Sequence, residues 1–398
     1  MSISKQPKDE TYANTIPYGS LGIIAMPGCE ELAEKVDAYI AMWRSNRVNG
    51  IDGYHKDSYI VDAACPRFGS GEAKGMLCQS VRGDDLFIMA DVTNYSVTYN
   101  MYGKEVPLSP DEHFQNIKRI IAAVSGKAKR ITVIMPFLYE SRQHRRTSRE
   151  SLDCAIALQE LVNIGVSAIV TMDAHDPRVQ NAIPYSTFES VNPVYQNIKA
   201  LLKNERDLTL DSEHLMIISP DEGAMGRAIE YSTALGVNMG MFYKRRDFTK
   251  IVGGKNPIVA HEYLGESVEG KDVIIIDDMI ASGDSLLDVA RQLKARKARK
   301  IFAFATFGLF TKGMETFDKA VEEGLINRIY TSNCIYQNPE TKSRKYYRSV
   351  DVSKYLALLI DTMNHDTSIE SLIWPYDKIK DRVTKYKAMR EVEKKSEE

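Results

Sequence analysis

A chain of 398 residues is long enough for two domains of ordinary size, and its 43% hydrophobic and 27% charged residues are typical of a globular protein. The net charge of -2 provides no general basic field, which argues against nucleic acid as a partner. The five cysteines are scattered without a CxxC pair, and no hydrophobic run is long enough to span a membrane. We therefore expect a cytoplasmic protein that binds neither nucleic acid nor membrane.

The first half of the chain alternates short hydrophobic runs with segments of helical spacing, after a polar arm over residues 1–17. Between residues 183 and 194 this pattern lapses into polar residues with two prolines, so we place a domain boundary there. The expected strands are Leu21–Met26, Leu86–Ala90, Ile131–Met135 and Ala168–Met172, and the expected helices are Cys29–Met42, His113–Val124 and Leu152–Val162.

The second half repeats this alternation, and strands that alternate with helices predict two α/β domains with mostly parallel sheets flanked by helices. After Tyr376 the composition predicts a charged helix. We expect a first domain over residues 18–190, a second over residues 191–350, and a helical segment with a charged tail over residues 351–398. The expected strands are Leu215–Ile218, Val237–Phe242, Val273–Ile276, Ile301–Thr306 and Ile329–Thr331.

The most informative stretch is KDVIIIDDMIASGDS, which runs from Lys271 to Ser285. Asp277 and Asp278 fall where the buried strand should end, and a loop of small residues then leads into a segment of helical spacing. A strand, a small-residue loop and a helix start offer unpaired backbone N–H groups to a phosphate. Two carboxylates beside such a loop predict a sugar phosphate ligand, and a plain strand-to-helix turn is the alternative.

Other polar clusters also follow predicted strands, and in open parallel sheets ligands bind at the carboxyl ends of the strands. The segments are FGSGE at Phe68, SRQHRRTSRE at Ser141, MDAHDP at Met172, SPDEGAMGRA at Ser219, KRR at Lys244 and DDMIASGDS at Asp277. Taken singly, each is compatible with an ordinary turn or a solvated loop. Taken in this order and at this spacing, the six segments resemble those of the ribose-phosphate pyrophosphokinase family.

The resemblance implies two phosphoribosyltransferase-like domains, the first on the ATP side and the second on the ribose 5-phosphate side. It implies a Mg²⁺-dependent transferase of nucleotide biosynthesis that moves the diphosphoryl group of ATP to the 1-hydroxyl of ribose 5-phosphate and releases AMP. It also implies a homo-oligomer that is based on dimers and can reach a hexamer.

The same resemblance assigns roles to individual residues of this chain. ATP is expected to contact Phe68, Ser70, Glu72, Arg142, Gln143 and His175, with Phe68 and Glu72 reaching it from a neighbouring subunit. Ribose 5-phosphate is expected to contact Asp277, Asp278, Ala281, Ser282, Gly283, Asp284 and Ser285. Mg²⁺ is expected to bind His175 and Asp221. Catalysis is assigned to Lys244 and Arg246, at the base of a mobile loop with the sequence DFTKIVGGKNP.

Several residues depart from the family pattern: Ser70, His144 and Ala281 replace acids, Glu222 replaces a neutral residue, and Ala224 replaces a glycine. They leave open an enzyme for a related ribosyl phosphate. A non-catalytic regulatory subunit is a second alternative, although it would have no reason to keep the predicted catalytic residues. A gene regulator that senses phosphoribosyl pyrophosphate is a third, but it would not explain the Arg-Gln segment or the second domain.

Overall fold

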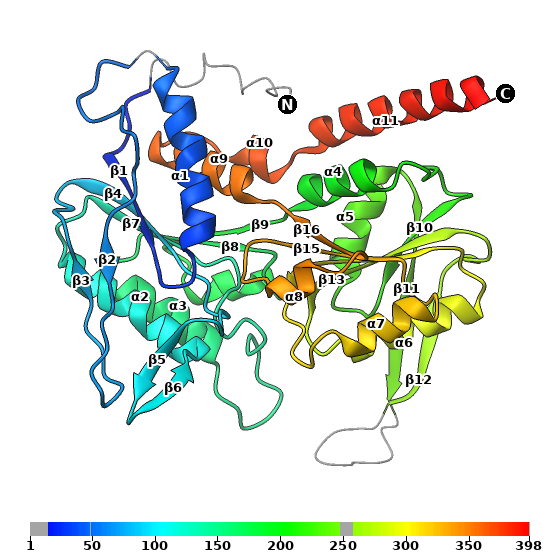
Figure 1. The fold of residues 1–398 in the computed structure, drawn as a ribbon, viewed down its shortest axis with the longest axis horizontal. Helices are drawn as coiled ribbons and strands as arrows, with labels where there is room; N and C mark the ends of the chain where they lie inside the picture. Colours follow the sequence, from blue (N-terminus) through cyan, green and yellow to red (C-terminus); the bar gives the residue numbers. More distant parts are fainter. Residues whose placement is uncertain (1–14, 48, 247–257, 398) are drawn as a thin grey trace. The chain divides into compact units, whose positions relative to one another are not determined.

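The computed structural model of the protein describes residues 15–47, 49–246 and 258–397. The chain divides into two compact units, whose ribbon is drawn in Figure 1. Unit 1 comprises residues 1–192, 333–336 and 351–374, and unit 2 comprises residues 193–332, 337–350 and 375–398. The residues that follow position 350 are therefore shared between the two units.

Unit 1 is built on a five-stranded sheet in the order β1-β4-β7-β8-β9, in which all neighbouring strands are parallel. The middle strands are almost wholly buried, as expected for a parallel sheet that is covered on both faces. The strands are β1 (Ser20–Ala25), β4 (Asp84–Met89), β7 (Arg130–Ile134), β8 (Ala168–Met172) and β9 (Thr187–Val191). The helices are α1 (Glu30–Ser45), α2 (Pro110–Val124), α3 (Asp153–Asn163), α9 (Ser353–Asn364) and α10 (Glu370–Ile373), with a 3-10 helix over Pro177–Ala182.

Two short antiparallel pairs lie outside this sheet. The first joins β2 (Ala63–Ala64) to β3 (Met76–Leu77), and the second is a hairpin of β5 (Thr98–Met101) and β6 (Lys104–Pro107). The hairpin lies near α2 and projects away from the sheet of unit 1 (Figure 1).

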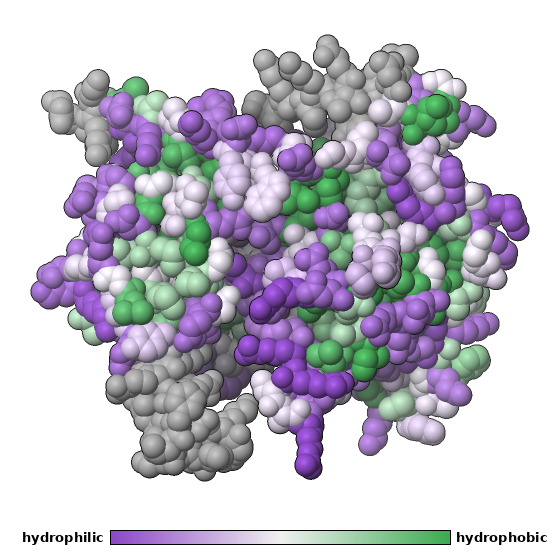
Figure 2. All heavy atoms as spheres, turned by 180° about the vertical axis from the view of Figure 1, so that it is seen from behind, coloured by the Kyte–Doolittle hydropathy of each residue, from purple (hydrophilic) through white to green (hydrophobic). Residues whose placement is uncertain are grey.

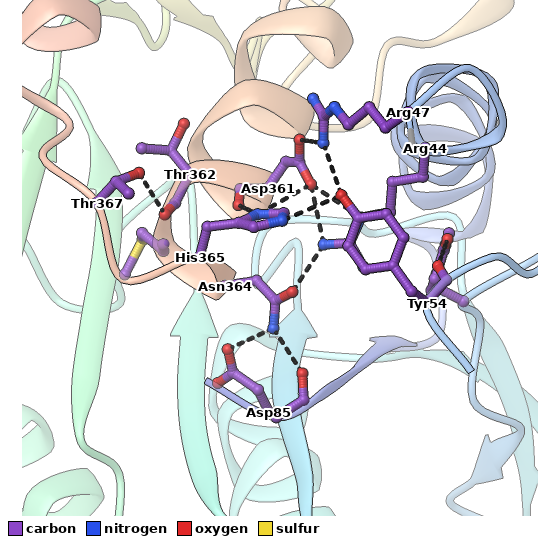
Figure 3. A network of polar contacts seen from close by, with 12 residues as sticks. Arg44, Arg47, Tyr54, Asp85, Asp361, Thr362, Asn364, His365 and Thr367 are labelled. Atoms are coloured by element: carbon purple, nitrogen blue, oxygen red, sulfur yellow. Dashed lines mark hydrogen bonds and ion pairs between the residues drawn. The ribbon is translucent and has the colours of Figure 1, made fainter. Parts of the chain in front are cut away.

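A buried polar network joins α9 to the N-terminal part of unit 1 (Figure 3). Asp361 accepts a hydrogen bond from Arg44 Nε at 2.9 Å and one from Arg47 at 2.7 Å. Arg44 also donates to Asn364, whose amide donates to the buried Asp85 on β4 at 2.9 Å. Because each of these charges is paired and hydrogen-bonded inside the fold, α9 belongs structurally to the same unit as Arg44, which lies 317 positions before Asp361 in the chain.

Unit 2 is built on a seven-stranded sheet in the order β12-β11-β10-β13-β14-β15-β16, in which only the β11–β12 pair is antiparallel among the described strands. The strands are β10 (Leu215–Ser219), β11 (Asn238–Arg246), β12 (Ile258–Leu264), β13 (Asp272–Ile280), β14 (Ile301–Gly308), β15 (Arg328–Ser332) and β16 (Tyr347–Val350). The helices are α4 (Val194–Asn204), α5 (Met225–Leu235), α6 (Asp284–Ala295), α7 (Glu315–Glu322), α8 (Pro339–Lys342) and α11 (Tyr376–Glu397).

Both faces of this sheet carry a hydrophobic core, because successive side chains of a strand point to opposite faces. In β13, Val273 and Ile275 join the core that includes residues of α6 and α7, whereas Ile274 and Ile276 join the core with residues of α4 and α5. The charged helix α11 contributes to the second core through three side chains at helical spacing, namely Ile379, Val383 and Tyr386. Its first turns are therefore part of the fold of unit 2.

Among the described residues, no helix combines the length and the apolar character that crossing a bilayer requires. Hydrophilic and hydrophobic residues are interspersed on the face that Figure 2 shows.

The predicted fold class of two mostly parallel α/β sheets is confirmed, and each predicted strand and helix has a counterpart. One local interpretation was wrong, and one strand was missed. The strand expected to end before Asp277 continues to Ile280, because β14 runs to Gly308 and keeps pairing with it. The stretch between residues 183 and 194 contains β9, an edge strand of the first sheet, which its polar sequence did not reveal.

Candidate functional site

The predicted sugar phosphate site of unit 2 starts with two adjacent acids inside β13. Asp277 is partly exposed, whereas Asp278 is buried, with 3% of its surface exposed. The amide of Asp278 donates to the Asp277 carboxylate at 2.9 Å. Burial, together with the nearby charges of Asp278 and Asp221, raises the pKa of Asp277 well above its ordinary value. The three acids are therefore close enough for their charges to disfavour the ionised form of Asp277.

The loop after β13 turns directly into α6 at Gly283, which has a φ of +86°. A Cβ atom on Gly283 would lie 2.2 Å from the ring of Phe317, so only glycine suits both the backbone and the space. Ser282 donates to the Asp284 carboxylate, which also forms an ion pair with Lys312 at 2.6 Å. The loop thus leads to the N-terminus of a 12-residue helix, whose first amides and dipole favour an anion.

A second acidic turn lies between β10 and α5, next to β13 in the sheet. The Asp221 carboxylate accepts the amides of Gly223 at 3.0 Å and Ala224 at 3.3 Å, which fixes its orientation at the start of α5. On the first turn of the same helix, Arg227 approaches the Asp278 carboxylate to 3.9 Å. Sequence reasoning missed Arg227, although it lies within the SPDEGAMGRA segment that was recognised.

The predicted catalytic cations lie on β11. The backbones of Lys244 and Arg246 pair with β12, opposite His261 and Ile258. The predicted mobile loop over residues 247–257 lies outside the described residues. The structure thus places the backbones of the two cations on a strand of unit 2, and their roles stay a prediction.

In unit 1, the predicted His175 follows β8 in a loop that β9 supports. The amide of Asp173 donates to the Val191 carbonyl, and the amide of Ala174 donates to the Ser190 hydroxyl, both at 3.0 Å. These bonds anchor the residues just before His175 to the edge strand. The position of His175 therefore depends on β9, the strand that the sequence did not reveal.

His144 lies next to His175, with ring centroids 5.3 Å apart. Its Nε2 atom is 3.5 Å from Asp176, and its Nδ1 atom is buried without a hydrogen-bond partner in the described part of the chain. Burial lowers the pKa of His144, whereas hydrogen bonds from Arg178 lower the pKa of Asp176 to about 2. Two imidazoles and an ionised carboxylate therefore meet where the family pattern predicts only His175 with its flanking acids.

The basic loop that begins at Ser141 carries two further predicted ATP contacts. Gln143 uses its side-chain amide inside the loop, where it donates to the Ser151 carbonyl at 2.8 Å, and Arg142 is exposed. The start of the loop is held by Tyr139, which donates to Asp111 on α2 at 2.7 Å and stacks on the ring of a neighbouring phenylalanine. Gln143 thus braces the loop that presents Arg142.

The Phe68–Glu72 turn is held by Glu112, which follows Asp111 on the first turn of α2. Glu112 accepts a hydrogen bond from Arg67 at 3.0 Å, and Arg67 also donates to the Gly71 carbonyl at 2.8 Å. Ser70 donates to Glu72 at 2.9 Å, and Phe68 is 55% exposed. The first turn of α2 therefore supports both predicted ATP-contacting segments. Its signal in the sequence was the capping box Ser-Pro-Asp-Glu that begins at Ser109.

Two family models match this chain. Residues 21–165 match the N-terminal domain of ribose phosphate pyrophosphokinase, and residues 184–320 match a phosphoribosyl transferase domain. A ribose-phosphate pyrophosphokinase of Mycoplasma pneumoniae is 30% identical over 69% of this chain and 76% of its own length. The one from Vibrio cholerae is 27% identical over 79% of this chain and 91% of its own length.

The fold is similar to that of a solved phosphoribosylpyrophosphate synthetase from Mycobacterium smegmatis. The TM-score is 0.69 at 20% sequence identity, and the match covers 87% of this chain and 99% of that one. Both units therefore have the phosphoribosyltransferase-like α/β fold that the resemblance predicted. With both domains matched in order, the chain belongs to the ribose-phosphate pyrophosphokinase family.

Proposed function

We propose that this chain catalyses the Mg²⁺-dependent transfer of the diphosphoryl group from ATP to O1 of ribose 5-phosphate, with release of AMP. The observation that carries the proposal lies in unit 2, where the acid pair of β13 is followed by a helix that begins at Gly283, in a conformation that suits only glycine. Membership of the family supports the same reaction.

The helix start of α6 provides the phosphate half of the sugar site. Backbone amides of the Ala281–Ser285 loop and the hydroxyls of Ser282 and Ser285 bind the 5-phosphate, and the helix dipole adds to the attraction. Asp277 and Asp278 precede this loop on β13 and hold the 2- and 3-hydroxyls by accepting hydrogen bonds. A ligand that carries both a phosphate and neighbouring hydroxyls satisfies both features.

Mg²⁺ suits the residues that are present. Burial and the nearby charges of Asp278 and Asp221 raise the pKa of Asp277, and a divalent cation would offset the repulsion between these acids. Within the described ranges, no cluster of three or more acidic, histidine or cysteine ligands forms a complete metal cage. Mg²⁺ is usually bound by one or two carboxylates together with substrate phosphates. Asp221 would hold it on the sugar side and His175 on the ATP side, where it would neutralise phosphate charge.

The reaction requires attack by O1 of the sugar on the β-phosphorus of ATP. The bond from that phosphorus to the α,β-bridging oxygen breaks, so AMP leaves with that oxygen and the proton of the 1-hydroxyl is released. Lys244 and Arg246 stabilise the negative charge that spreads over the transferred group. Arg142 and His175 hold the phosphates of ATP, while Phe68 stacks on the adenine.

The test is to incubate the purified protein with ATP, Mg²⁺ and ribose 5-phosphate and to follow AMP and the diphosphorylated sugar. Asp278→Asn should weaken ribose 5-phosphate binding, and Lys244→Ala should abolish turnover while ribose 5-phosphate still binds. Asp381→Asn is the matched control, because Asp381 is an exposed carboxylate on α11 that pairs only locally with Lys385 among the described contacts.

Absence of AMP above background from folded, oligomeric protein would contradict the proposed activity. Ribose 5-phosphate binding without turnover would instead favour a non-catalytic subunit. Faster AMP release with another ribosyl phosphate would change the acceptor and keep the reaction.

A further inference from the structure

The hairpin β5–β6 is attached to the turn that presents Phe68. The amide of Tyr102, at the tip of the hairpin, donates to the Gly69 carbonyl at 3.1 Å. Gly71 has a φ of +95°, and a Cβ atom there would lie 2.7 Å from the sulfur of Met101. The turn and the hairpin tip are therefore in direct backbone contact, and the turn is shaped to accept the hairpin.

Contacts among three side chains hold the hairpin against the turn. The guanidinium of Arg67 lies 4.4 Å from the centre of the Tyr99 ring on β5, and the Tyr99 hydroxyl donates to Glu112 at 2.6 Å. Glu112 also accepts the bond from Arg67 at 3.0 Å, which closes the triangle. Charge-assisted bonds of this kind are about twice as strong as neutral ones, so the hairpin and the turn should move as one body.

The residue at the tip is unusual for its backbone. Met101 pairs with Lys104, so Tyr102 and Gly103 form a two-residue turn, and both have positive φ, 49° and 76°. Such type I′ turns favour Asn, Asp or Gly at the first position. Tyr102 is 81% exposed, so packing of its ring contributes little stability that could offset the cost of its positive φ. Local stability therefore does not explain a tyrosine at this position.

We propose that Tyr102 is a second base-contacting residue of the nucleotide site, held beside Phe68 by the hairpin so that both rings contact the adenine. The inference rests on the proposed function, which places ATP at Phe68. An exposed aromatic ring binds a nucleobase by stacking, a contact that tolerates any base because each has a π-face. The Glu72 carboxylate of the same turn can accept a hydrogen bond from the exocyclic amino group, which gives the choice of adenine.

A protein partner fits this surface less well. The residues that flank the two rings are polar or small, with Ser70, Lys104 and Glu105 all exposed. Two aromatic side chains bury about 300–500 Å² at most, whereas a stable interface needs about 800 Å² from each partner. A flat, polar-edged ligand such as a nucleobase matches the size and the chemistry of this surface.

The test is the variant Tyr102→Asn, which removes the ring and places a preferred residue in the type I′ turn, so the fold is retained. It should raise KM for ATP, and the calorimetric Kd for ATP, by about two- to tenfold, the range expected for one aromatic contact. KM for ribose 5-phosphate should stay unchanged, and Tyr102→Phe should restore ATP binding. GTP binding should weaken by the same factor, since stacking does not select the base.

Tyr185→Asn is the matched control, because Tyr185 is a fully exposed tyrosine on another loop of unit 1 and should leave all constants unchanged. An ATP Kd for Tyr102→Asn equal to that of the wild type would overturn the inference. Loss of the oligomer in sedimentation would also overturn it and would assign Tyr102 to a subunit contact. If the wild type binds ATP but makes no AMP, the proposed function fails, while the Kd comparison still decides the role of Tyr102.

Discussion

The substitution Asp361→Asn should destabilise unit 1 strongly. Asp361 is 1% exposed and is the shared acceptor of Arg44 and Arg47, whose side chains are 1% and 6% exposed (Figure 3). An asparagine keeps the shape but leaves two buried guanidinium groups facing a neutral amide. Breaking a buried ion pair from one side typically costs about 3–5 kcal/mol, because the remaining charge stays buried and uncompensated.

The loss should be visible in two measurements. For a unit of this size, about 3–5 kcal/mol corresponds to a decrease in Tm of about 6–20 °C in scanning calorimetry. Because a two-unit protein need not unfold in one step, hydrogen exchange should locate the effect. Amides of α1 and α9 should exchange faster, whereas those of β13 and β14 in unit 2 should not.

Asp366→Asn is the matched control for this prediction. It makes the same chemical change five residues later, in a carboxylate that is 68% exposed and pairs with Arg130 at 3.3 Å. Exposed pairs contribute about 1 kcal/mol or less, so the Tm should change little. If Asp361→Asn shifted the Tm no more than Asp366→Asn, the buried network would not be what attaches α9 to unit 1.

Three further predictions concern the sugar site and pH. Gly283→Ala should lower the Tm by several degrees and abolish ribose 5-phosphate binding, because the added Cβ atom would overlap the ring of Phe317. Gly270→Ala is the control: Gly270 also has a positive φ, but a Cβ atom there would have no neighbour within 4 Å, so binding should be kept. Arg227→Gln should raise KM for ribose 5-phosphate by about two- to fivefold, because it removes the cation beside Asp278, an interaction of about 1 kcal/mol. Arg227→Lys keeps the charge and should behave like the wild type. Burial lowers the pKa of His365, so the unfolded chain binds the proton more readily than the folded chain. The contribution of His365 to the unfolding free energy is therefore complete above about pH 6.5 and is lost as the pH falls towards the folded-state pKa. His365→Gln should flatten this decline when urea titrations at about pH 7.5 and about pH 5.5 are compared.

The strands buried on both faces could be predicted because burial leaves a direct trace in the sequence. Val273–Ile276 is an unbroken apolar run, since each of its side chains joins a core on one face or the other. The helix after it was equally clear, because its buried residues recur at helical spacing. Where a segment contributes to the core along its whole length, the pattern alone is sufficient.

Other elements depend on partners that are distant in the chain. β9 is only partly buried and pairs on one side among the described strands, so its polar sequence resembles a linker. The pairing of Arg44 with Asp361 spans 317 positions, and nothing in either local sequence announces it. The extension of β13 to Ile280 reflects the length of its neighbour β14. These features result from tertiary pairing, which local periodicity does not record.

The candidate site was predicted as separate clusters, and the structure adds the residues that support them. Glu112 and Arg67 hold the Phe68 turn, and β9 holds the loop of His175. Such supporting side chains lie outside the recognised segments, so a motif identifies the residues that are proposed to touch a ligand but not those that position them. Only the capping box of α2 left a readable signal.

The departures from the family pattern change side chains more than backbone geometry. The Ala281 carbonyl accepts the amide of Thr311, and Gly283 keeps the conformation that begins α6, so replacing an acid at position 281 leaves the amides of the loop in place. Relative to the acid that the resemblance predicts at position 144, His144 lacks a negative charge and places an imidazole beside His175, while Asp176 stays ionised through its bonds to Arg178. Less negative charge near a triphosphate favours its binding. Ala281 therefore has little effect on the proposed phosphate loop, whereas His144 alters the charge around the nucleotide. A change in binding specificity is expected first on the ATP side.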